Sequence, residues 1–249
     1  MSLQDSKNLR GKLALITGCT GGIGNATALA LARLGCSIAV HYNSAEAKAN
    51  ELVKELEGLP GVRAAAFQAD LSGYDGARKL HADVVRVLGH PDILFNNAGV
   101  VSSVIGPNGN IQDISAETFE ATWRTNTGTA FLLTQLCMFS MEERKWGRIV
   151  FNSSVAAGTG GVIGPHYAAS KSAMHGLLHW TANRYAKDGI TCNAVAPALI
   201  IETSIMANPS EELGKRIPIG RFGRPQEVAS VVELLVTNAY MTNKVSFGV

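Results

Sequence analysis

The chain has 249 residues, of which 46% are hydrophobic and 17% are charged, and it contains no apolar run of the roughly 18 residues that a membrane span needs. Its 22 basic and 20 acidic residues leave a formal net charge of +2, and no basic stripe is interleaved with aromatic residues. This balance argues against nucleic acid and against a membrane surface as partners. A chain of this length buries enough surface for one large core without disulfides or metal ions.

Four cysteines, Cys19, Cys36, Cys137 and Cys192, stand far apart and form no C-x-x-C pair. Their mostly apolar surroundings predict reduced, buried thiols in an intracellular compartment. Residues 1–10 lack the apolar stretch of a secretory signal and are too short and acidic for a transit peptide. We therefore expect a cytoplasmic location, with an organellar matrix as the alternative.

Short apolar runs alternate with longer amphipathic ones along the chain. The runs typical of strands are residues 13–17, 37–41, 63–68, 92–96, 148–152 and 191–195. Several are apolar throughout, as expected of strands covered on both faces. The segments typical of helices are residues 23–34, 45–57, 75–88, 116–144 and 167–187. Gly35, Gly58 and Gly89 follow three of these helices, where a left-handed helix stop is expected.

Strand and helix alternate without a break, which predicts a parallel sheet with helices on both faces, a doubly wound α/β fold. No repeat, low-complexity tract or linker divides the chain, so residues 1–249 are expected to form a single domain. The loosest stretch is residues 198–223, after the sixth strand and at the sheet edge where ligands bind in such folds. A substrate lid and an ordinary surface loop both fit its composition.

The first predicted strand is followed directly by T-G-C-T-G-G-I-G, residues 17–24. Glycines in such a turn let a pyrophosphate approach main-chain N–H groups, and the following helix adds its positive dipole. The loop therefore predicts a dinucleotide site. Its spacing differs from G-x-G-x-x-G, and glycines also occur in tight turns for geometry alone.

Further polar motifs lie at the ends of predicted strands. Asp70 follows the third strand, and N-N-A-G at residues 96–99 closes the fourth. Ser154 follows the fifth strand, while Tyr167 and Lys171, four residues apart at a helix start, share one face of that helix. Each residue alone also fits an ordinary role in a core, a cap or a turn.

Together these motifs resemble the short-chain dehydrogenase/reductase family over almost the whole chain. The resemblance implies a Rossmann fold with a mainly parallel, seven-stranded sheet, and a catalytic tetrad of Asn126, Ser154, Tyr167 and Lys171. The residues that it implies for dinucleotide binding are Gly18, Thr20, Gly22, Ile23, Gly24, Asn43, Ser44, Asp70, Leu71, Asn97, Ala98, Gly99, Tyr167, Lys171, Pro197, Ile200 and Thr203.

The chemistry explains why the tetrad needs these residue types. Reduction of a carbonyl by hydride requires a proton for the oxygen, and a phenol with a pKa of about 10 is poorly matched to pH 7. Lowering that pKa by ~3 takes about 4 kcal/mol, which one ammonium about 4 Å away supplies at an effective dielectric constant of 20. We therefore expect Lys171 to lower the pKa of Tyr167, helped by the charge of an oxidised nicotinamide. Ser154 would hydrogen-bond the substrate oxygen, and Asn126, by resemblance, would hold a water that links Lys171 to solvent.

The choice of nicotinamide cofactor is expected at the end of the second strand, where a carboxylate favours NAD. Here the strand ends in H-Y-N-S, and no acid occurs before Glu46. Neutral donors at Asn43 and Ser44 suit a 2′-phosphate, so NADP(H) is favoured over NAD(H). The lack of an Arg at position 43 or in the glycine loop speaks against that preference.

The segment I-P-I-G-R-F-G-R-P-Q-E-V-A, residues 217–229, is similar to one that is frequent in the family's 3-oxoacyl-[acyl-carrier-protein] reductases. That segment is structural rather than catalytic, but the general run of the sequence also looks most like these reductases. The resemblance therefore implies a 3-oxoacyl thioester as the small-molecule substrate and a part in fatty acid biosynthesis. One alternative substrate is a sugar, a polyol or another secondary alcohol. An alternative of another class is a nucleotide-binding subunit without catalysis.

The carboxyl-terminal third departs from the family at two places. Pro197-Ala198 replaces the usual P-G, and the sequence stops at Gly248-Val249, about where relatives continue with D-G-G, so the last strand is expected to be incomplete. His175 and His179 are four residues apart, but they have no third ligand, so we expect packing there and no metal. In relatives the helices that match residues 116–144 and 167–187 pair between subunits, which implies a homotetramer.

Overall fold

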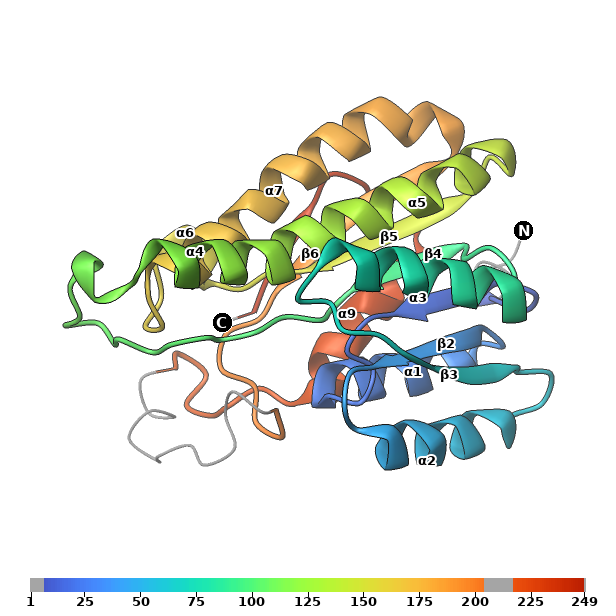
Figure 1. The fold of residues 1–249 in the computed structure, drawn as a ribbon. Helices are drawn as coiled ribbons and strands as arrows, with labels where there is room; N and C mark the ends of the chain where they lie inside the picture. The colour runs from blue at the N-terminus through green and yellow to red at the C-terminus, as the bar shows by residue number, and fades with distance from the viewer. Residues whose placement is uncertain (1–6, 204–216, 249) are drawn as a thin grey trace.

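A computed structural model describes residues 7–203 and 217–248 (Figure 1). Their strands form one seven-stranded sheet in the order β3-β2-β1-β4-β5-β6-β7, and every pairing in it is parallel. The strands are β1 (Leu13–Ile16), β2 (Ser37–Tyr42), β3 (Ala64–Gln68), β4 (Ile93–Asn96), β5 (Gly147–Asn152), β6 (Ile190–Ala196) and β7 (Val245–Phe247). The predicted doubly wound Rossmann fold is therefore confirmed. The last strand has three residues and pairs with the end of β6.

Helices cover both faces of the sheet (Figure 1). They are α1 (Gly22–Arg33), α2 (Glu46–Glu57), α3 (Tyr74–Val87), α4 (Ala116–Trp123), α5 (Thr129–Glu143), α6 (Ala156–Thr159), α7 (Pro165–Tyr185) and α9 (Pro225–Thr237). One apolar core lies between the strands and α1, α2 and α9, and a second lies between the strands and α3, α5 and α7. The strand β1 is apolar throughout, and the other central strands are largely apolar, because both of their faces are covered. None of the helices in the described ranges is long and apolar enough to cross a bilayer.

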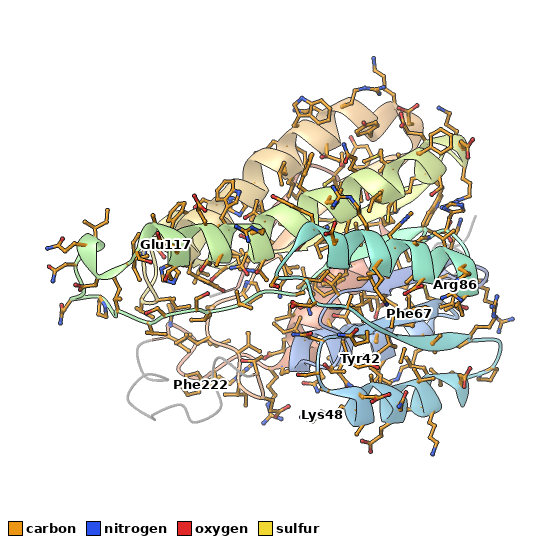
Figure 2. The ribbon with its side chains drawn as sticks, viewed as in Figure 1. Tyr42, Lys48, Phe67, Arg86, Glu117 and Phe222 are labelled. Atoms are coloured by element: carbon orange, nitrogen blue, oxygen red, sulfur yellow. The ribbon has the colours of Figure 1, made fainter. Side chains whose placement is uncertain are left out.

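Neighbouring strands supply both cores because side chains alternate along a strand. His41 on β2 pairs with Phe67 on β3, and Tyr42 pairs with Gln68. Tyr42 packs in the core under α1 and α2, whereas Phe67 packs in the core under α3 (Figure 2). The side chain of His41, which alternates with that of Tyr42, therefore leaves β2 on the Phe67 side.

Two sequence predictions about helices are wrong. Residues 116–144 are not one regular α-helix, because a π-helical turn at Arg124–Gly128 separates α4 from α5. Hydrophobic periodicity does not reveal such a turn, which here is held by hydrogen bonds to a loop outside the helix. The helix after β2 also lacks the predicted left-handed stop. Gly58 is right-handed, with φ −68°, and Gly61 takes the left-handed conformation instead, whereas Gly35 and Gly89 have φ +89° and +101° as predicted.

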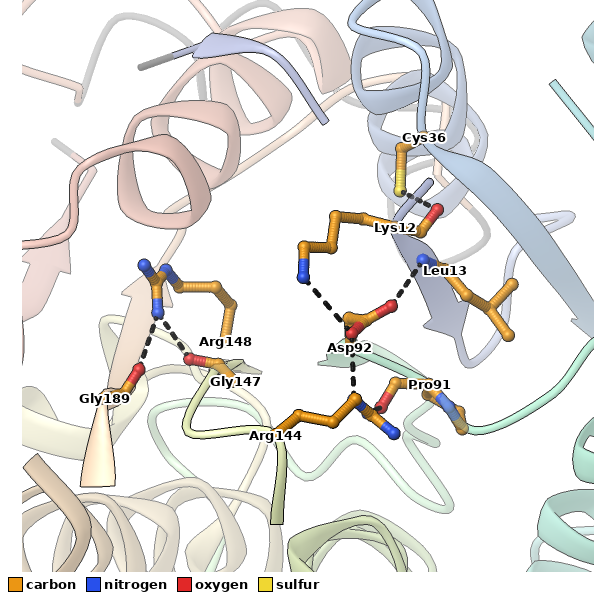
Figure 3. Close-up of polar contacts among 9 residues, drawn as sticks. All are labelled: Lys12, Leu13, Cys36, Pro91, Asp92, Arg144, Gly147, Arg148 and Gly189. Carbon is orange, nitrogen blue, oxygen red and sulfur yellow. Dashed lines mark hydrogen bonds and ion pairs between the residues drawn. The ribbon is translucent and has the colours of Figure 1, made fainter. Parts of the chain in front are cut away.

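Charged side chains gather at the amino-terminal ends of β1 and β4, whereas the glycine loop follows the carboxyl end of β1. Figure 3 shows this cluster around Asp92. The Asp92 carboxylate accepts a hydrogen bond from the Leu13 backbone N–H at 3.0 Å. It also lies 3.6 Å from Lys12 Nζ and 3.2 Å from Arg144 Nε. Asp92 thus satisfies the first N–H of β1 and joins the starts of β1 and β4 to the end of α5.

Arg148, at the start of β5, is buried beside this cluster (Figure 3). Its guanidinium donates hydrogen bonds to three backbone carbonyls, those of Val236 (3.0 Å), Gly147 (2.7 Å) and Gly189 (3.1 Å). It also stacks 4.3 Å from the centre of the Trp146 ring. Burial lowers its pKa to about 10, so the side chain is a cation at neutral pH and joins α9, β5 and the turn before β6.

Candidate active site

A cavity of about 990 Å³ lies beyond the carboxyl ends of the strands. This is the position where open parallel sheets bind their ligands. Its lining includes these predicted residues: Gly18, Thr20, Gly22, Ile23, Gly24, Asn43, Ser44, Asp70, Leu71, Asn97, Ala98, Gly99, Ser154, Tyr167, Lys171, Pro197, Ile200 and Thr203. The structure therefore brings the predicted dinucleotide residues and three of the four tetrad residues to one cavity.

The glycine loop has a shape that only glycine permits at several positions. Gly18 has φ +61°. A Cβ on Gly24 would lie 2.5 Å from the Gly18 carbonyl oxygen, and a Cβ on Gly22 would lie 2.3 Å from the Glu202 carbonyl oxygen. The N-terminus of α1 has no side-chain cap, so the N–H groups of its first turn are left for another acceptor. This arrangement fits the pyrophosphate of a dinucleotide.

Asn97 joins the loop to the end of β4. Its Nδ2 donates to the carbonyls of Thr17 at 2.8 Å and Gly18 at 3.1 Å. The Thr17 hydroxyl in turn accepts from the backbone N–H groups of Asn97 and Ala98, both at 2.9 Å. Asn152 Nδ2 donates to Asn97 Oδ1 at 2.9 Å. The N-N-A-G segment thus holds the loop in place through the Asn97 side chain and two backbone N–H groups.

The helix α7 carries Tyr167 and Lys171 into the cavity. It begins at Pro165, whose fixed φ and missing N–H suit the first turn of a helix. Tyr167 is 7% exposed and Lys171 is 3% exposed. Lys171 Nζ donates a hydrogen bond of 2.7 Å to the Asn152 carbonyl and lies 5.6 Å from the centre of the Tyr167 ring. The Ser154 hydroxyl accepts a hydrogen bond from the Ala156 N–H at 3.2 Å and lies beside the phenol, whose pKa it lowers.

The expected lowering of the Tyr167 pKa is not present in this structure. Burial raises the pKa of the phenol above its ordinary value, and the hydrogen bond from Ser154 opposes this only in part. Lys171 is directed at the Asn152 carbonyl, so its charge is not centred on the phenol oxygen. Burial also lowers the pKa of Lys171 to about 8, which leaves it mostly protonated at pH 7.

Asn126 lies behind the cavity, in the π-helical turn, and is fully buried. Its Oδ1 accepts from the Val100 N–H at 2.8 Å, and its Nδ2 donates to the Val100 carbonyl at 3.2 Å and to Ser170 Oγ at 3.0 Å. A Cβ on Gly99 would lie 3.3 Å from both Asn126 Oδ1 and Lys171 Nζ. The amide and the ammonium therefore face the same space beside Gly99.

The predicted lid is only partly described. Residues 204–216 of the 198–223 segment lie outside the described residues. Its two ends meet, because Ile200 and Gly223 form an isolated β-bridge and the Ile201 N–H donates to the Gly223 carbonyl at 3.0 Å. Ile200 also lines the cavity, so this junction lies at the edge of the site.

His175 and His179 on α7 both make polar contacts with other side chains. His175 Nε2 lies 2.9 Å from Ser153 Oγ, and the His175 ring packs edge-on against Phe247. His179 Nδ1 hydrogen-bonds Asn243 Oδ1. The described part of the chain holds no cluster of three or more His, Cys, Asp or Glu residues that could ligate a metal. All four cysteines are free and buried, as predicted, and burial raises their pKa values.

The remainder of the cavity lining is mostly apolar. Lining residues that were not predicted as site residues include His41, Val100, Thr125, Asn152, Ser153, Val155, Thr159, Val162, Ile163, Leu199 and Ile217. In the described lining, Asp70 is the only carboxylate and Lys171 the only lysine or arginine. No motif could have pointed to the apolar residues, because they lie on connections whose course the sequence does not specify.

Comparison with known proteins agrees with this geometry. The family model described as short chain dehydrogenase matches residues 12–214. The 3-oxoacyl-[acyl-carrier-protein] reductase FabG of Aquifex aeolicus is 34% identical, over 95% of this chain and 95% of that protein. The L-rhamnose 1-dehydrogenase (NAD(P)(+)) of a Sphingomonas species is 32% identical, over 95% of this chain and 94% of its own length.

A solved structure gives the same result for the fold. The crystal structure of a blue fluorescent protein from a metagenomic library, in complex with NADPH, superposes with a TM-score of 0.85. It is 32% identical and covers 96% of this chain and 97% of its own. Since the family match and these relatives extend over nearly the whole sequence, the chain belongs to the short-chain dehydrogenase/reductase family, the NAD(P)-dependent oxidoreductases that act on CH–OH and C=O groups.

Proposed function

We propose that residues 1–249 form one domain that reduces a carbonyl substrate with NADPH, with residues 198–223 as its substrate lid. The observation that carries this proposal is the shared cavity, in which Ser154, Tyr167 and Lys171 lie beside a glycine loop shaped for a pyrophosphate. The first-choice substrate is a 3-oxoacyl thioester, as in fatty acid biosynthesis.

The dinucleotide is held by groups from five connections. The N–H groups of the first turn of α1 would bind the pyrophosphate, Asp70 and Leu71 would hold the adenine, and Pro197, Ile200 and Thr203 would hold the nicotinamide. When bound, the cofactor supplies the hydride and, once oxidised, a positive charge near the phenol. The remaining proton chemistry is done by the side chains of the chain itself.

Each tetrad residue has a separate task. The Ser154 hydroxyl hydrogen-bonds the substrate oxygen and fixes its distance to the phenol of Tyr167, which donates the proton. The resulting phenolate lies in a buried site, where a nearby cation is worth more than in water. Lys171, protonated at neutral pH, supplies that cation. Asn126 and Lys171 face one space beside Gly99, where a water would carry the replacement proton.

Substitution of the proton donor tests this mechanism. Tyr167→Phe keeps the buried ring but removes the hydroxyl, so we expect kcat to fall by at least about 100-fold while NADPH binding stays nearly unchanged. Tyr185→Phe, near the other end of α7, is the matched control and should keep full activity. Retention of most activity by Tyr167→Phe would exclude the proposed role. Full binding with no activity in the unmodified enzyme, over a broad carbonyl panel, would instead favour the non-catalytic subunit.

The preference for NADPH is supported by the turn after β2. Asn43 and Ser44 line the cavity, and Asp70 is the carboxylate of the described lining. Asn43 and Ser44 offer neutral hydrogen-bond donors to a 2′-phosphate, and the similar structure cited above was solved with NADPH. Reduction rates with NADPH and NADH at equal concentration test the preference, and a large preference for NADH would reject it.

The apolar lining favours an acyl substrate over a sugar. Val155, Val162, Ile163, Leu199 and Ile217 offer no hydrogen-bonding side chains for the hydroxyls of a polyol. The similarity to an L-rhamnose dehydrogenase keeps a sugar or another secondary alcohol as the second candidate. Activity with acetoacetyl thioester against a panel of polyols separates the two.

We propose further that copies of this chain pair through α4, α5 and α7 into a homotetramer. Large aromatic side chains stand exposed on these helices, among them Trp123 (40%), Phe139 (69%) and Trp180 (64%). Exposed apolar patches of this kind mark interaction surfaces. Light scattering of the purified protein tests the number of copies.

The cytoplasmic location stays a prediction.

A further inference from the structure

His41, near the end of β2, is 2% exposed and lines the dinucleotide cavity. Its Nδ1 lies 2.8 Å from the Gly18 backbone nitrogen, and its Nε2 lies 3.1 Å from the Ala69 carbonyl oxygen. A backbone N–H only donates, so Nδ1 carries no proton and accepts. A carbonyl only accepts, so Nε2 carries the proton and donates. The two bonds therefore fix one neutral tautomer.

These bonds join two segments that face the dinucleotide. Gly18 belongs to the glycine loop after β1, and Ala69 directly precedes Asp70 in the turn after β3. Backbone contacts strengthen the same junction, because the Cys19 N–H donates to the His41 carbonyl at 2.8 Å. The imidazole is the side chain that spans from one segment to the other. The ring fixes the distance between its acceptor, Nδ1, and its donor, Nε2, and so holds the glycine loop and the turn at a fixed distance from each other.

Resting on the proposed dinucleotide site, we propose that His41 is a positioning residue that holds the glycine loop and the Ala69–Asp70 turn at the spacing the dinucleotide requires. It makes no contact with the reacting atoms. Burial lowers its pKa to about 4, so the imidazole keeps an acceptor for Gly18 at neutral pH. Because the Gly18 and Cys19 N–H groups are already bonded to His41, the phosphates would be bound by the N–H groups of the first turn of α1.

Two substitutions separate the two bonds. In His41→Asn, Oδ1 takes the place of Nδ1 and still accepts from Gly18, but Nδ2 falls one bond short of the position of Nε2. In His41→Phe the ring keeps its size and both hydrogen bonds are lost, which leaves the Gly18 N–H without its acceptor. His90→Phe, at an exposed histidine after α3, is the control.

We expect His41→Phe to raise the Kd for NADPH and the KM for NADPH at least 10-fold, and His41→Asn to lie between it and the wild type. With NADPH saturating, kcat and the KM for the carbonyl should stay within twofold, since the catalytic groups are not touched. Fluorescence titration and steady-state rates give these values. Two results would overturn the proposal: NADPH binding by His41→Phe within twofold of wild type, or an equal loss in kcat and in both KM values.

The tautomer of His41 gives an independent test, because a histidine that only fills space in the core would not need one particular ring nitrogen to carry the proton. In ¹⁵N NMR of the wild-type protein, the His41 ring should show an unprotonated Nδ1 and a protonated Nε2 at pH 7, and a protonated Nδ1 would overturn the assignment. This measurement, with His41→Asn, keeps the proposal testable if His41→Phe fails to fold. A wild-type protein that binds no dinucleotide would reject the proposed function, and the spectrum would still decide the geometry of His41.

Discussion

The buried ammonium of Lys171 lowers the unfolding free energy of the protein by an amount that can be measured. Its side chain is 3% exposed and donates a hydrogen bond to the Asn152 carbonyl at 2.7 Å. Met is unbranched like Lys and fills nearly the same volume, but it is one atom shorter and carries no charge. Lys171→Met should therefore abolish activity and remove the cost of burying a cation.

The magnitude follows from the pKa of Lys171. Burial lowers it from 10.5 to about 8, and each pH unit of that difference corresponds to 1.36 kcal/mol. The charged side chain therefore costs the folded protein about 3 kcal/mol at neutral pH. The variant also loses the hydrogen bond to Asn152, worth about 1.5–3 kcal/mol for a charged donor, so its net stability at pH 7 should stay close to that of the wild type.

The pH dependence separates the charge from the hydrogen bond. Between pH 8 and 10.5 the unfolded chain keeps the proton on Lys171 while the folded chain has released it. Stability rises with pH wherever the unfolded state binds more protons. The wild type should therefore gain about 2–3 kcal/mol of unfolding free energy relative to Lys171→Met between pH 7 and pH 10.

Urea unfolding followed by circular dichroism at several pH values measures this difference. Lys187→Met replaces an exposed lysine and is the control, with a curve that should run parallel to the wild type. The reasoning would be refuted if the unfolding free energies of Lys171→Met and the wild type changed with pH by the same amount, to within about 0.5 kcal/mol. In that case the Lys171 side chain would not be a buried cation, and the electrostatic part of the mechanism would be wrong.

Two further substitutions test other parts of the structure. Arg148→Met leaves three backbone carbonyls without their donor, so it should lower the unfolding free energy by about 3 kcal/mol in urea titrations while kcat at 25 °C stays unchanged. A kcat that falls with stability would show that the amino-terminal edge is coupled to the site. Gly24→Ala places a Cβ 2.5 Å from the Gly18 carbonyl, so NADPH affinity should fall at least 10-fold. Gly73→Ala, with open space around it, is the control, and equal affinities in the two variants would contradict the reasoning.

The sequence was sufficient to predict the fold and about half of the residues that line the cavity. Apolar strands between amphipathic helices specify a doubly wound sheet because a strand covered on both faces is made mostly of apolar residues. The glycines of the loop were informative because at Gly22 and Gly24 backbone atoms approach too closely for a Cβ. Both signals are local, so a single sequence displays them.

Features that depend on contacts between distant segments could not be predicted. His41 reads as an ordinary strand residue, and its two hydrogen bonds exist only because β1 and β3 both flank β2. The π-helical turn around Asn126 depends on bonds to Val100 from another connection. The pKa of Tyr167 depends on burial, which raises it in this structure although spacing alone predicted a decrease.

The two ends of β5 show how the fold tolerates a buried cation in its active site. At its start, Arg148 bonds the carbonyls of Val236 and Gly189, so the strand is tied to α9 and to the turn before β6. At its end, the Asn152 carbonyl accepts from Lys171, and the Asn152 amide holds Asn97. Burial destabilises the charged ammonium, so a rigid hydrogen-bond acceptor is needed to keep it in place. Because β5 is bonded to a neighbouring strand on each side, the Asn152 carbonyl cannot move away from the ammonium. The ammonium is thus held near the phenol, where its charge is needed once the proton has left.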